Sequence, residues 1–358
     1  MNDLLSLLPD ELEALLLSVG EPKYRAKQMF PQLHRGLSPD EMTNIGKTTR
    51  EKLATVTQYH LPQVRRRLVS AIDGTVKYLF ELRDGHCVES VVMKYNHGNT
   101  ICISSQVGCR MGCKFCASTI GGKVRDLLPG ELLGQIVAAQ KDLGERIDNV
   151  VMMGIGEPLD NFDNVVQFLK LVAHPDGLNI GYRHISLSTC GVVPNIYRLA
   201  ELDLPITLSI SLHASDNETR SSIMPVNKRW GVDELLDACK AYYDKTGRRL
   251  SFEYTLIAGK NDTPTQASHL AGVLNRHLRT RETTMPIHVN LIPVNEVTET
   301  GFTRSSADAV KAFAATLEKK GIRATVRRTL GADINASCGQ LRREDAENGE
   351  ESARGSAP

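Results

Sequence analysis

Short apolar segments alternate with longer amphipathic segments from about residue 100 to about residue 328. Strands are predicted at 101–106, 149–153, 184–190, 206–213, 251–257, 287–293 and 322–328. Helices are expected between them, for example at 130–142, 232–246, 264–280 and 305–320. Because two parallel strands need a crossover connection that is usually a helix, this alternation predicts parallel βα units and an α/β fold.

Two of the predicted strands carry polar side chains along one face. In 206–213, strict alternation puts Ile and Leu on one face and Thr, Ser, Ser and His on the other. The strand 184–190 has the same pattern, and its polar face consists of His184, Ser186, Ser188 and Cys190. A parallel sheet packed on both sides should be apolar on both faces. The pattern therefore indicates a barrel whose lumen holds a polar ligand.

The flanking segments have other patterns. Residues 1–60 have helical spacing of apolar residues and are predicted to form a small helical accessory domain. In 61–98, apolar residues alternate and Asp-Gly pairs mark turns, which predicts a short antiparallel β extension. The barrel core is expected at 99–343, and the polar tail 344–358 is expected to be disordered.

Composition and charge restrict the class of protein. Hydrophobic residues make up 41 % and charged residues 24 %, as in ordinary globular proteins. The formal net charge of +1 does not by itself indicate a nucleic-acid partner, although a neutral total can hide a basic face. The N-terminus is acidic where a signal peptide would be basic, and no apolar run is long enough to span a bilayer. We therefore expect a cytoplasmic protein with no membrane partner.

Three of the eight cysteines lie close together, directly after the first predicted strand of the barrel. They are Cys109, Cys113 and Cys116. In the reducing cytoplasm such a group more often binds metal than forms disulfides. Three thiolates can hold a [4Fe–4S] cluster and leave one iron open to chelate a ligand. The alternative is a zinc site, but zinc prefers a fourth Cys or His at a second close pair, and none lies nearby.

A glycine-rich turn follows the next predicted strand, with the sequence Gly154-Ile155-Gly156-Glu157-Pro158. Glycines let a backbone approach a ligand closely, and Glu157 could accept a hydrogen bond from an ammonium group. Taken alone, the segment could equally be an ordinary turn at the end of a strand.

The C-x₃-C-x₂-C motif, with an aromatic residue before its last cysteine, resembles that of the radical S-adenosylmethionine (SAM) superfamily. The resemblance implies a TIM-like partial (β/α)₆ barrel with one [4Fe–4S] cluster at its C-terminal mouth. It also implies S-adenosylmethionine as the second cofactor, cleaved reductively to a 5′-deoxyadenosyl radical. The glycine-rich turn looks like the methionine-binding turn of the superfamily.

A closer resemblance covers nearly the whole chain except about the last fifteen residues. Residues 99–109, 153–162, 288–295 and 333–341 are similar to signatures of the dual-specificity ribosomal and transfer RNA adenine carbon-2 methyltransferases. One departure is Asn335-Ala336-Ser337, where that family is expected to have Asp-Ala-Ala. The cysteine that follows, Cys338, is retained.

The family resemblance assigns three catalytic residues. Carbon 2 of adenine is electron-poor and cannot attack a sulfonium methyl group directly. The family instead uses two SAM molecules: Cys338 becomes an S-methylcysteine intermediate, Glu89 is the proton acceptor, and Cys102 resolves the RNA adduct through a transient disulfide with Cys338. From spacing alone, Cys102 would be a core residue and Glu89 a solvated strand residue. Cys87, Cys190 and Cys239 are expected to be core.

The same resemblance implies the binding partners. The residues that match cofactor-binding positions are Gly156, Glu157, Ser188, Ser211, Leu212, His213 and Asn295. The implied substrates are an adenine of 23S ribosomal RNA at the peptidyl-transferase centre and an anticodon-loop adenine of transfer RNAs. An electron donor such as flavodoxin or ferredoxin is also implied. The helical domain 1–60 is expected to bind RNA, and Lys23, Arg25, Lys27 and 65–67 could contact phosphates or simply be solvated.

Two alternatives remain open from the sequence. The first is the sister enzyme that methylates carbon 8 of the same adenine and gives antibiotic resistance. It shares the cysteines, but Gly-Glu-Ala is expected there in place of Gly156-Glu157-Pro158. The second is a non-catalytic iron–sulfur protein that binds RNA. The pair Cys102 and Cys338 argues against it, because binding alone needs no resolving thiol.

Overall fold

A computed structural model describes residues 1–279, 285–295, 301–336 and 341, and its centre is one large sheet. Among these residues the sheet has ten strands in the order β14-β13-β12-β11-β10-β9-β6-β5-β4-β3. The parallel strands are β6 (Gly98–Cys102), β9 (Asn149–Met152), β10 (Ile185–Thr189), β11 (Thr207–Ser211), β12 (Leu250–Leu256), β13 (His288–Pro293) and β14 (Arg323–Val326). The order is open, since β14 is at one end and β3 at the other.

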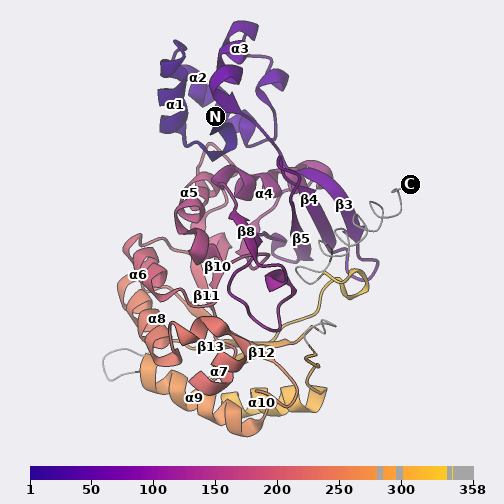
Figure 1. The fold of residues 1–358 in the computed structure, drawn as a ribbon, viewed down its shortest axis with the longest axis vertical. Helices are drawn as coiled ribbons and strands as arrows, with labels where there is room; N and C mark the ends of the chain where they lie inside the picture. The colour runs from indigo at the N-terminus through magenta and orange to yellow at the C-terminus, as the bar shows by residue number, and fades with distance from the viewer. Residues whose placement is uncertain (280–284, 296–300, 337–340, 342–358) are drawn as a thin grey trace, which may run out of the picture.

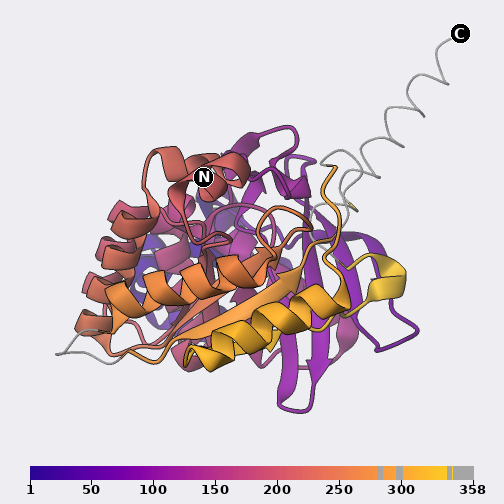
Figure 2. The ribbon, with the colours of Figure 1, turned by 90° about the horizontal axis from the view of Figure 1, so that it is seen from below.

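A helical segment follows each parallel strand except the last and covers the outer face of the sheet, as Figure 2 shows for α9 and α10. These helices are α4 (Pro129–Leu143), α5 (Phe162–Ala173), α6 (Val193–Glu201), α8 (Val232–Thr246), α9 (Pro264–Leu278) and α10 (Ala307–Lys319), whereas the short α7 (Asn217–Ile223) packs beside Cys113. Their apolar faces and the outer face of the strands form the core. The result is the partial (β/α)₆ barrel that the alternation and the resemblance predict.

The first predicted strand of the barrel, 101–106, is wrong in its bounds. The chain leaves the sheet after Cys102, and Gln106–Gly108 (β7) pairs antiparallel with Lys123–Asp126 (β8) in a separate two-stranded sheet. The cause is a turn that side chains hold: the Ser104 amide donates to Gln135 Oε1 at 2.9 Å, and Ser104 Oγ donates to the Glu89 carbonyl at 2.7 Å. Both partners of Ser104 are distant in the sequence, so the local pattern alone could not locate the turn.

The antiparallel extension consists of β3 (Gln63–Val69), β4 (Val76–Glu81) and β5 (Cys87–Tyr95). Strand β5 pairs with β6, so the extension continues the barrel sheet across the expected boundary at residue 99. The alternation in β4 suggests one solvated face, yet both Lys77 and Leu79 are buried. Strand β4 therefore has two packed faces.

The N-terminal helices α1 (Pro9–Ser18), α2 (Tyr24–Leu33) and α3 (Lys47–Val56) form a small unit at one end of the molecule (Figure 1). Inside it, the buried Glu21 accepts from Thr49 Oγ1 at 2.9 Å and pairs with Lys52 at 2.8 Å. The unit is joined to the barrel through Ser6, whose hydroxyl accepts from the Gly130 amide at 2.8 Å. No helix in the described part of the chain is both long and apolar enough to cross a bilayer.

Gly130 and Gly272 provide a matched test of the joint between the N-terminal unit and the barrel, because both are helical glycines. A Cβ on Gly130 would lie 2.0 Å from Asp3 Oδ2 and 2.8 Å from Leu5 Cβ, whereas a Cβ on Gly272 would meet nothing within 4 Å. We expect Gly130→Ala to destabilise the protein by about 1–3 kcal/mol through overpacking. Gly272→Ala should stabilise it by about 0.5–1 kcal/mol. Urea unfolding followed by circular dichroism measures both, and equal effects would contradict the packing of Asp3 on α4.

Candidate active site

A cavity of about 220 Å³ lies against the barrel strands, and the three clustered cysteines line it. Most of the cofactor-binding residues expected from the sequence line the same cavity. They are Gly156, Glu157, Ser188, Ser211 and His213. Leu212 is different, because its side chain is fully buried in the core. Asn295 lines a second cavity instead.

The cysteine loop is shaped by backbone contacts. Gly108 has a φ of +77°, and a Cβ there would lie 2.0 Å from the Gly122 carbonyl oxygen, so only glycine fits before Cys109. The Cys109 amide donates to that same carbonyl at 3.0 Å. Within the loop, the Cys116 amide donates to the Cys113 carbonyl at 3.1 Å. These bonds fix the path of the backbone on which the three thiols stand.

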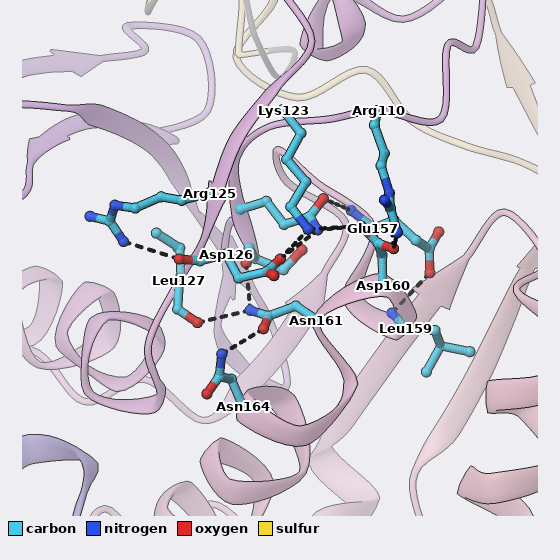
Figure 3. A network of polar contacts seen from close by, with 12 residues as sticks. Arg110, Lys123, Arg125, Asp126, Leu127, Glu157, Leu159, Asp160, Asn161 and Asn164 are labelled. Carbon is cyan, nitrogen blue, oxygen red and sulfur yellow. Dashed lines mark hydrogen bonds and ion pairs between the residues drawn. The ribbon is translucent and has the colours of Figure 1, made fainter.

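A polar network clamps this loop to the segment after the glycine-rich turn (Figure 3). At its centre is the Asp160 carboxylate, which pairs with Arg110 of the cysteine loop, with Lys123 at 3.0 Å and with Gln106 Nε2 at 2.9 Å. Burial acts to raise the pKa of Asp160, but the hydrogen bonds from Arg110, Gln106 and Lys123 outweigh it and lower the pKa. Asp160 is thus an anion that holds two chain segments together. No sequence pattern identifies Asp160 as a contact between segments, and only its position two residues after Pro158 hints at this role.

The glycine-rich turn packs closely on the chain that leaves β6. A Cβ on Gly154 would lie 2.6 Å from the Ile103 carbonyl oxygen, and Gly156 has a φ of +107°. Glu157 is buried and accepts from the Cys190 amide at 2.7 Å and from the Leu159 amide at 3.0 Å. Burial raises the pKa of Glu157. Its carboxylate therefore ties the turn to the end of β10.

The polar faces of β10 and β11 lie side by side in the lumen, as their alternation predicts. Ser186 and Ser209 hydroxyls lie 3.1 Å apart, and Ser188 and Ser211 hydroxyls lie 3.5 Å apart. His213 follows β11 with a φ of +57°, and its Nδ1 accepts from the Thr255 amide at 2.9 Å. Burial lowers the pKa of His213 to about 3, so the imidazole is neutral at ordinary pH.

The donor set of the first cavity fits an iron–sulfur cluster. Burial raises the pKa of the Cys109 thiol to about 12 and also raises that of Cys113, so these thiols are protonated until iron displaces the protons. In the described residues, no group of three or more Cys, His, Asp or Glu is arranged to hold a single metal ion. Thiol ligation of a cluster needs three separate corners rather than one shared centre. The three thiols that line this one cavity suit the corners of a cluster.

A second cavity, of about 210 Å³, contains Cys102. Cys102 packs there with Val91, Met93 and Ala336, although Ala336 is far away in the sequence. Met153, Ile292 and Arg327 line both this cavity and the cysteine-lined one, so the two cavities share a wall. Cys338 lies outside the described residues, but the chain just before it reaches the cavity of Cys102.

Glu89 is not solvated. It faces Lys77, whose Nζ lies 3.2 Å from Glu89 Oε2, and each side chain is only 1 % exposed. An ion pair removed from water in this way is costly unless further hydrogen bonds satisfy it. Lys77 indeed donates to the Asn335 carbonyl at 2.8 Å. No sequence pattern indicates this pairing, because Lys77 is on a strand whose alternation predicts one solvated face.

The remaining cysteines and basic residues differ from the expectations in part. Cys239 is a core residue as expected, and Cys190 is buried but also lines the first cavity. Cys87 is half-exposed at the start of β5, so the expectation that it is core was wrong. Arg220 was missed: it is fully buried, and its guanidinium donates to the Cys190 carbonyl at 2.6 Å and the Ser211 carbonyl at 3.2 Å. It holds two strand ends beside the cavity.

Comparisons with known proteins agree on one family. The radical SAM superfamily model matches residues 103–269, and the model of the ribosomal RNA large subunit methyltransferase N-terminal domain matches residues 2–58. The chain is 52 % identical over 347 residues to the "Probable dual-specificity RNA methyltransferase RlmN" of Alkaliphilus oremlandii, covering 97 % of this chain and 99 % of that protein. A protein with the same description from Clostridium novyi is 50 % identical, with 96 % and 98 % covered.

A solved structure resembles the whole fold. It is a radical SAM methyltransferase from Sphaerobacter thermophilus, with 40 % sequence identity and a TM-score of 0.88. The similarity covers 95 % of this chain and 99 % of that one.

Asp160→Asn tests the clamp on the cysteine loop. The amide cannot replace the anion, so Arg110 and Lys123 lose their charge partner and the loop should loosen. 

We expect a chelator to remove iron about tenfold faster, which is the lower end of the effect on metal affinity of residues that support metal ligands. Asp163→Asn is the matched control, since Asp163 pairs with Arg198 at 2.8 Å on the exposed side of the same segment. Iron release is followed by absorbance under anaerobic conditions, and equal rates in both variants would contradict the clamp.

Proposed function

The chain belongs to the dual-specificity RNA methyltransferase family of the radical SAM superfamily, and from this membership we infer its reaction. It is a SAM-dependent enzyme that methylates carbon 2 of adenine in ribosomal and transfer RNA. Its cofactors are a [4Fe–4S] cluster and S-adenosylmethionine. The finer assignments below, of sites, roles and partners, are our proposals.

Cys109, Cys113 and Cys116 would hold the cluster, since they line one cavity. Ser188, Ser211 and the Gly156-Glu157 turn line the same cavity and would bind S-adenosylmethionine, together with His213 and the main chain at Leu212. When bound, the two cofactors supply the reductive cleavage that activates a methyl group. The protein's own contribution is to bind and orient the reactants and to keep water out.

The observation that carries the catalytic proposal is the shared wall of the two cavities. Because Met153, Ile292 and Arg327 face both, a group that Cys338 carries would pass from the cofactor cavity to Cys102 over a short path. Cys338 would carry the methyl group as a thioether. The adenosyl radical would take one hydrogen atom from this methyl group, its carbon would bond to carbon 2 of the adenine, and the unpaired electron left on the base would return to the cluster when the carbon-2 proton is removed. Asn295 lines the cavity of Cys102 and would contact the ligand from that side.

Glu89 and Cys102 would complete the reaction. Glu89 would take the proton from carbon 2, and Lys77, whose Nζ lies 3.2 Å from Glu89 Oε2, would hold that side chain in place. The Cys102 thiolate would then attack the sulfur of Cys338. A sulfur–sulfur bond forms, the sulfur–carbon bond breaks, and its electron pair stays with the carbon, which takes up a proton to become the methyl group of the product.

The target bases and partners follow from the family. We propose an adenine of 23S ribosomal RNA at the peptidyl-transferase centre and an anticodon-loop adenine in transfer RNA, each extruded into the cavity of Cys102. The N-terminal unit, residues 1–60, would bind RNA. Among the basic residues considered for phosphate contact, Arg65 and Arg67 pair with Glu81 and Asp142 at 3.1 and 2.8 Å. A flavodoxin or ferredoxin would supply electrons, and the enzyme would act in the cytoplasm without a membrane partner.

The product distinguishes this enzyme from its carbon-8 sister. We expect 2-methyladenosine, because the chain has the Gly156-Glu157-Pro158 turn and its relatives are described as dual-specificity RNA methyltransferases. Ribosomal RNA and transfer RNA that lack the modification are treated with the reduced enzyme, digested to nucleosides and compared with both methylated standards by mass spectrometry. If 8-methyladenosine were the main product, the chain would belong to the resistance branch.

Cys102→Ala tests the resolving thiol. Without Cys102, the adduct between RNA and Cys338 has no thiol to release it, so RNA should stay covalently bound to the protein. If Cys102 only filled volume, the substitution would cost about 1–2 kcal/mol of stability and turnover would continue. A denaturing gel of anaerobic reactions with labelled RNA should show a slow band for Cys102→Ala and none for Cys102→Ala combined with Cys338→Ala. Release of methylated RNA at the normal rate by the folded single variant would refute the two-cysteine mechanism.

A further inference from the structure

The turn between β3 and β4 binds the chain just before the catalytic-cysteine segment. The Asp73 carboxylate accepts from the Gly331 amide at 2.8 Å. In the opposite direction, the Asp333 carboxylate accepts from Ser70 Oγ at 2.7 Å and from the Ala71 amide at 2.8 Å. Two segments more than 250 positions apart therefore exchange hydrogen bonds in both directions.

The bound segment, residues 331–336, is also folded on itself. The Ala336 amide donates to the Gly331 carbonyl at 3.1 Å, and a Cβ on Gly331 would lie 2.6 Å from Ala336 Cβ. Gly331 and Asn335 have φ values of +60° and +44°. Asn is among the residues that adopt this conformation most readily, so the Asn that stands where the family is expected to have Asp suits the backbone.

Lys77 joins the far end of this segment to the proposed catalytic base. Its buried Nζ pairs with Glu89 and donates to the main-chain carbonyl of Asn335. Because the contact is to the backbone, it does not depend on the side chain at residue 335. Ala336, the next residue, packs against Cys102.

We propose that residues 70–77 form a docking site for residues 331–336, which holds the catalytic-cysteine segment beside Cys102 and Glu89. Ser70, Asp73, Lys77 and Asp333 are positioning residues in this site. The inference rests on the proposed function, since it explains how the two thiols of that mechanism meet.

The length of free chain before Cys338 gives the expected size of the effect of docking on its encounter with Cys102. The last main-chain bond to the sheet before the docked segment is from the Arg327 amide to the Leu291 carbonyl, and eleven positions separate Arg327 from Cys338. A free chain of that length has a root-mean-square span of about 18 Å. From a docked Ala336, only two residues lead to Cys338, and they span at most about 7 Å. The effective concentration of the Cys338 thiol at Cys102 falls with about the three-halves power of tether length. Docking should therefore raise this concentration by about tenfold.

The equilibrium of the disulfide between Cys102 and Cys338 measures this concentration directly. The cluster-loaded enzyme is equilibrated with reduced and oxidised glutathione without oxygen, quenched with an alkylating agent, and the linked peptides are quantified by mass spectrometry. We expect Asp73→Ala combined with Asp333→Ala to shift the disulfide equilibrium constant down by about tenfold. Asp333 is exposed, so Asp333→Ala alone should fold and give a smaller shift in the same direction. Lys77→Met should also lower the constant.

The matched control is Ala332→Ser, an exposed change inside the docked segment that removes none of these contacts. Iron content and circular dichroism establish that each variant is folded and loaded. An unchanged disulfide equilibrium in the folded double variant would overturn the docking site and leave the two-cysteine mechanism standing. If the wild-type enzyme itself formed no such disulfide, both proposals would fall, because docking is proposed to serve that bond.

Discussion

The parallel arrangement of the barrel strands is the constraint on which the site depends. Loops that follow the carboxyl ends of parallel strands meet at one end of a barrel, whatever their distance in sequence. The cysteine loop after β6, the glycine-rich turn after β9, the end of β10 and His213 after β11 all obey this rule. Each of them lines the cysteine-lined cavity, so the topology gathers these loops around one cavity before any particular side chain is considered.

Close backbone approach is the second requirement at this end of the barrel. Gly108 and Gly154 each allow one chain segment to pass within contact distance of another carbonyl group. The Asp160 network adds ion pairs to this steric fit, because Asp160 joins the cysteine loop to the glycine-rich turn through Arg110 and Lys123. A loop that must keep three thiols in place is thus supported by steric fit on one side and by ion pairs on the other.

The buried ion pair of Lys77 and Glu89 differs from the contacts that support the cysteine loop. Replacing such a pair by apolar residues often leaves stability unchanged or improves it, so stability alone does not account for it. Here the same lysine also contacts the segment that leads to Cys338. The pair therefore ties Glu89 to a distant part of the chain.

Local patterns determined much of this protein from sequence alone. The periods of strands and helices predicted the barrel, and the alternation in 206–213 and 184–190 predicted the polar lumen. The spacing of three cysteines indicated a cluster. Each of these features depends on near neighbours in the chain. Contacts between distant segments were decided only by the tertiary structure. The turn at Ser104, the burial of Lys77 with Glu89, the role of Asp160 and the docking of 331–336 beside Cys102 all need a partner from elsewhere. From the sequence alone, a polar residue is expected to be exposed to water. Only the folded chain brings it the partner that makes its burial possible.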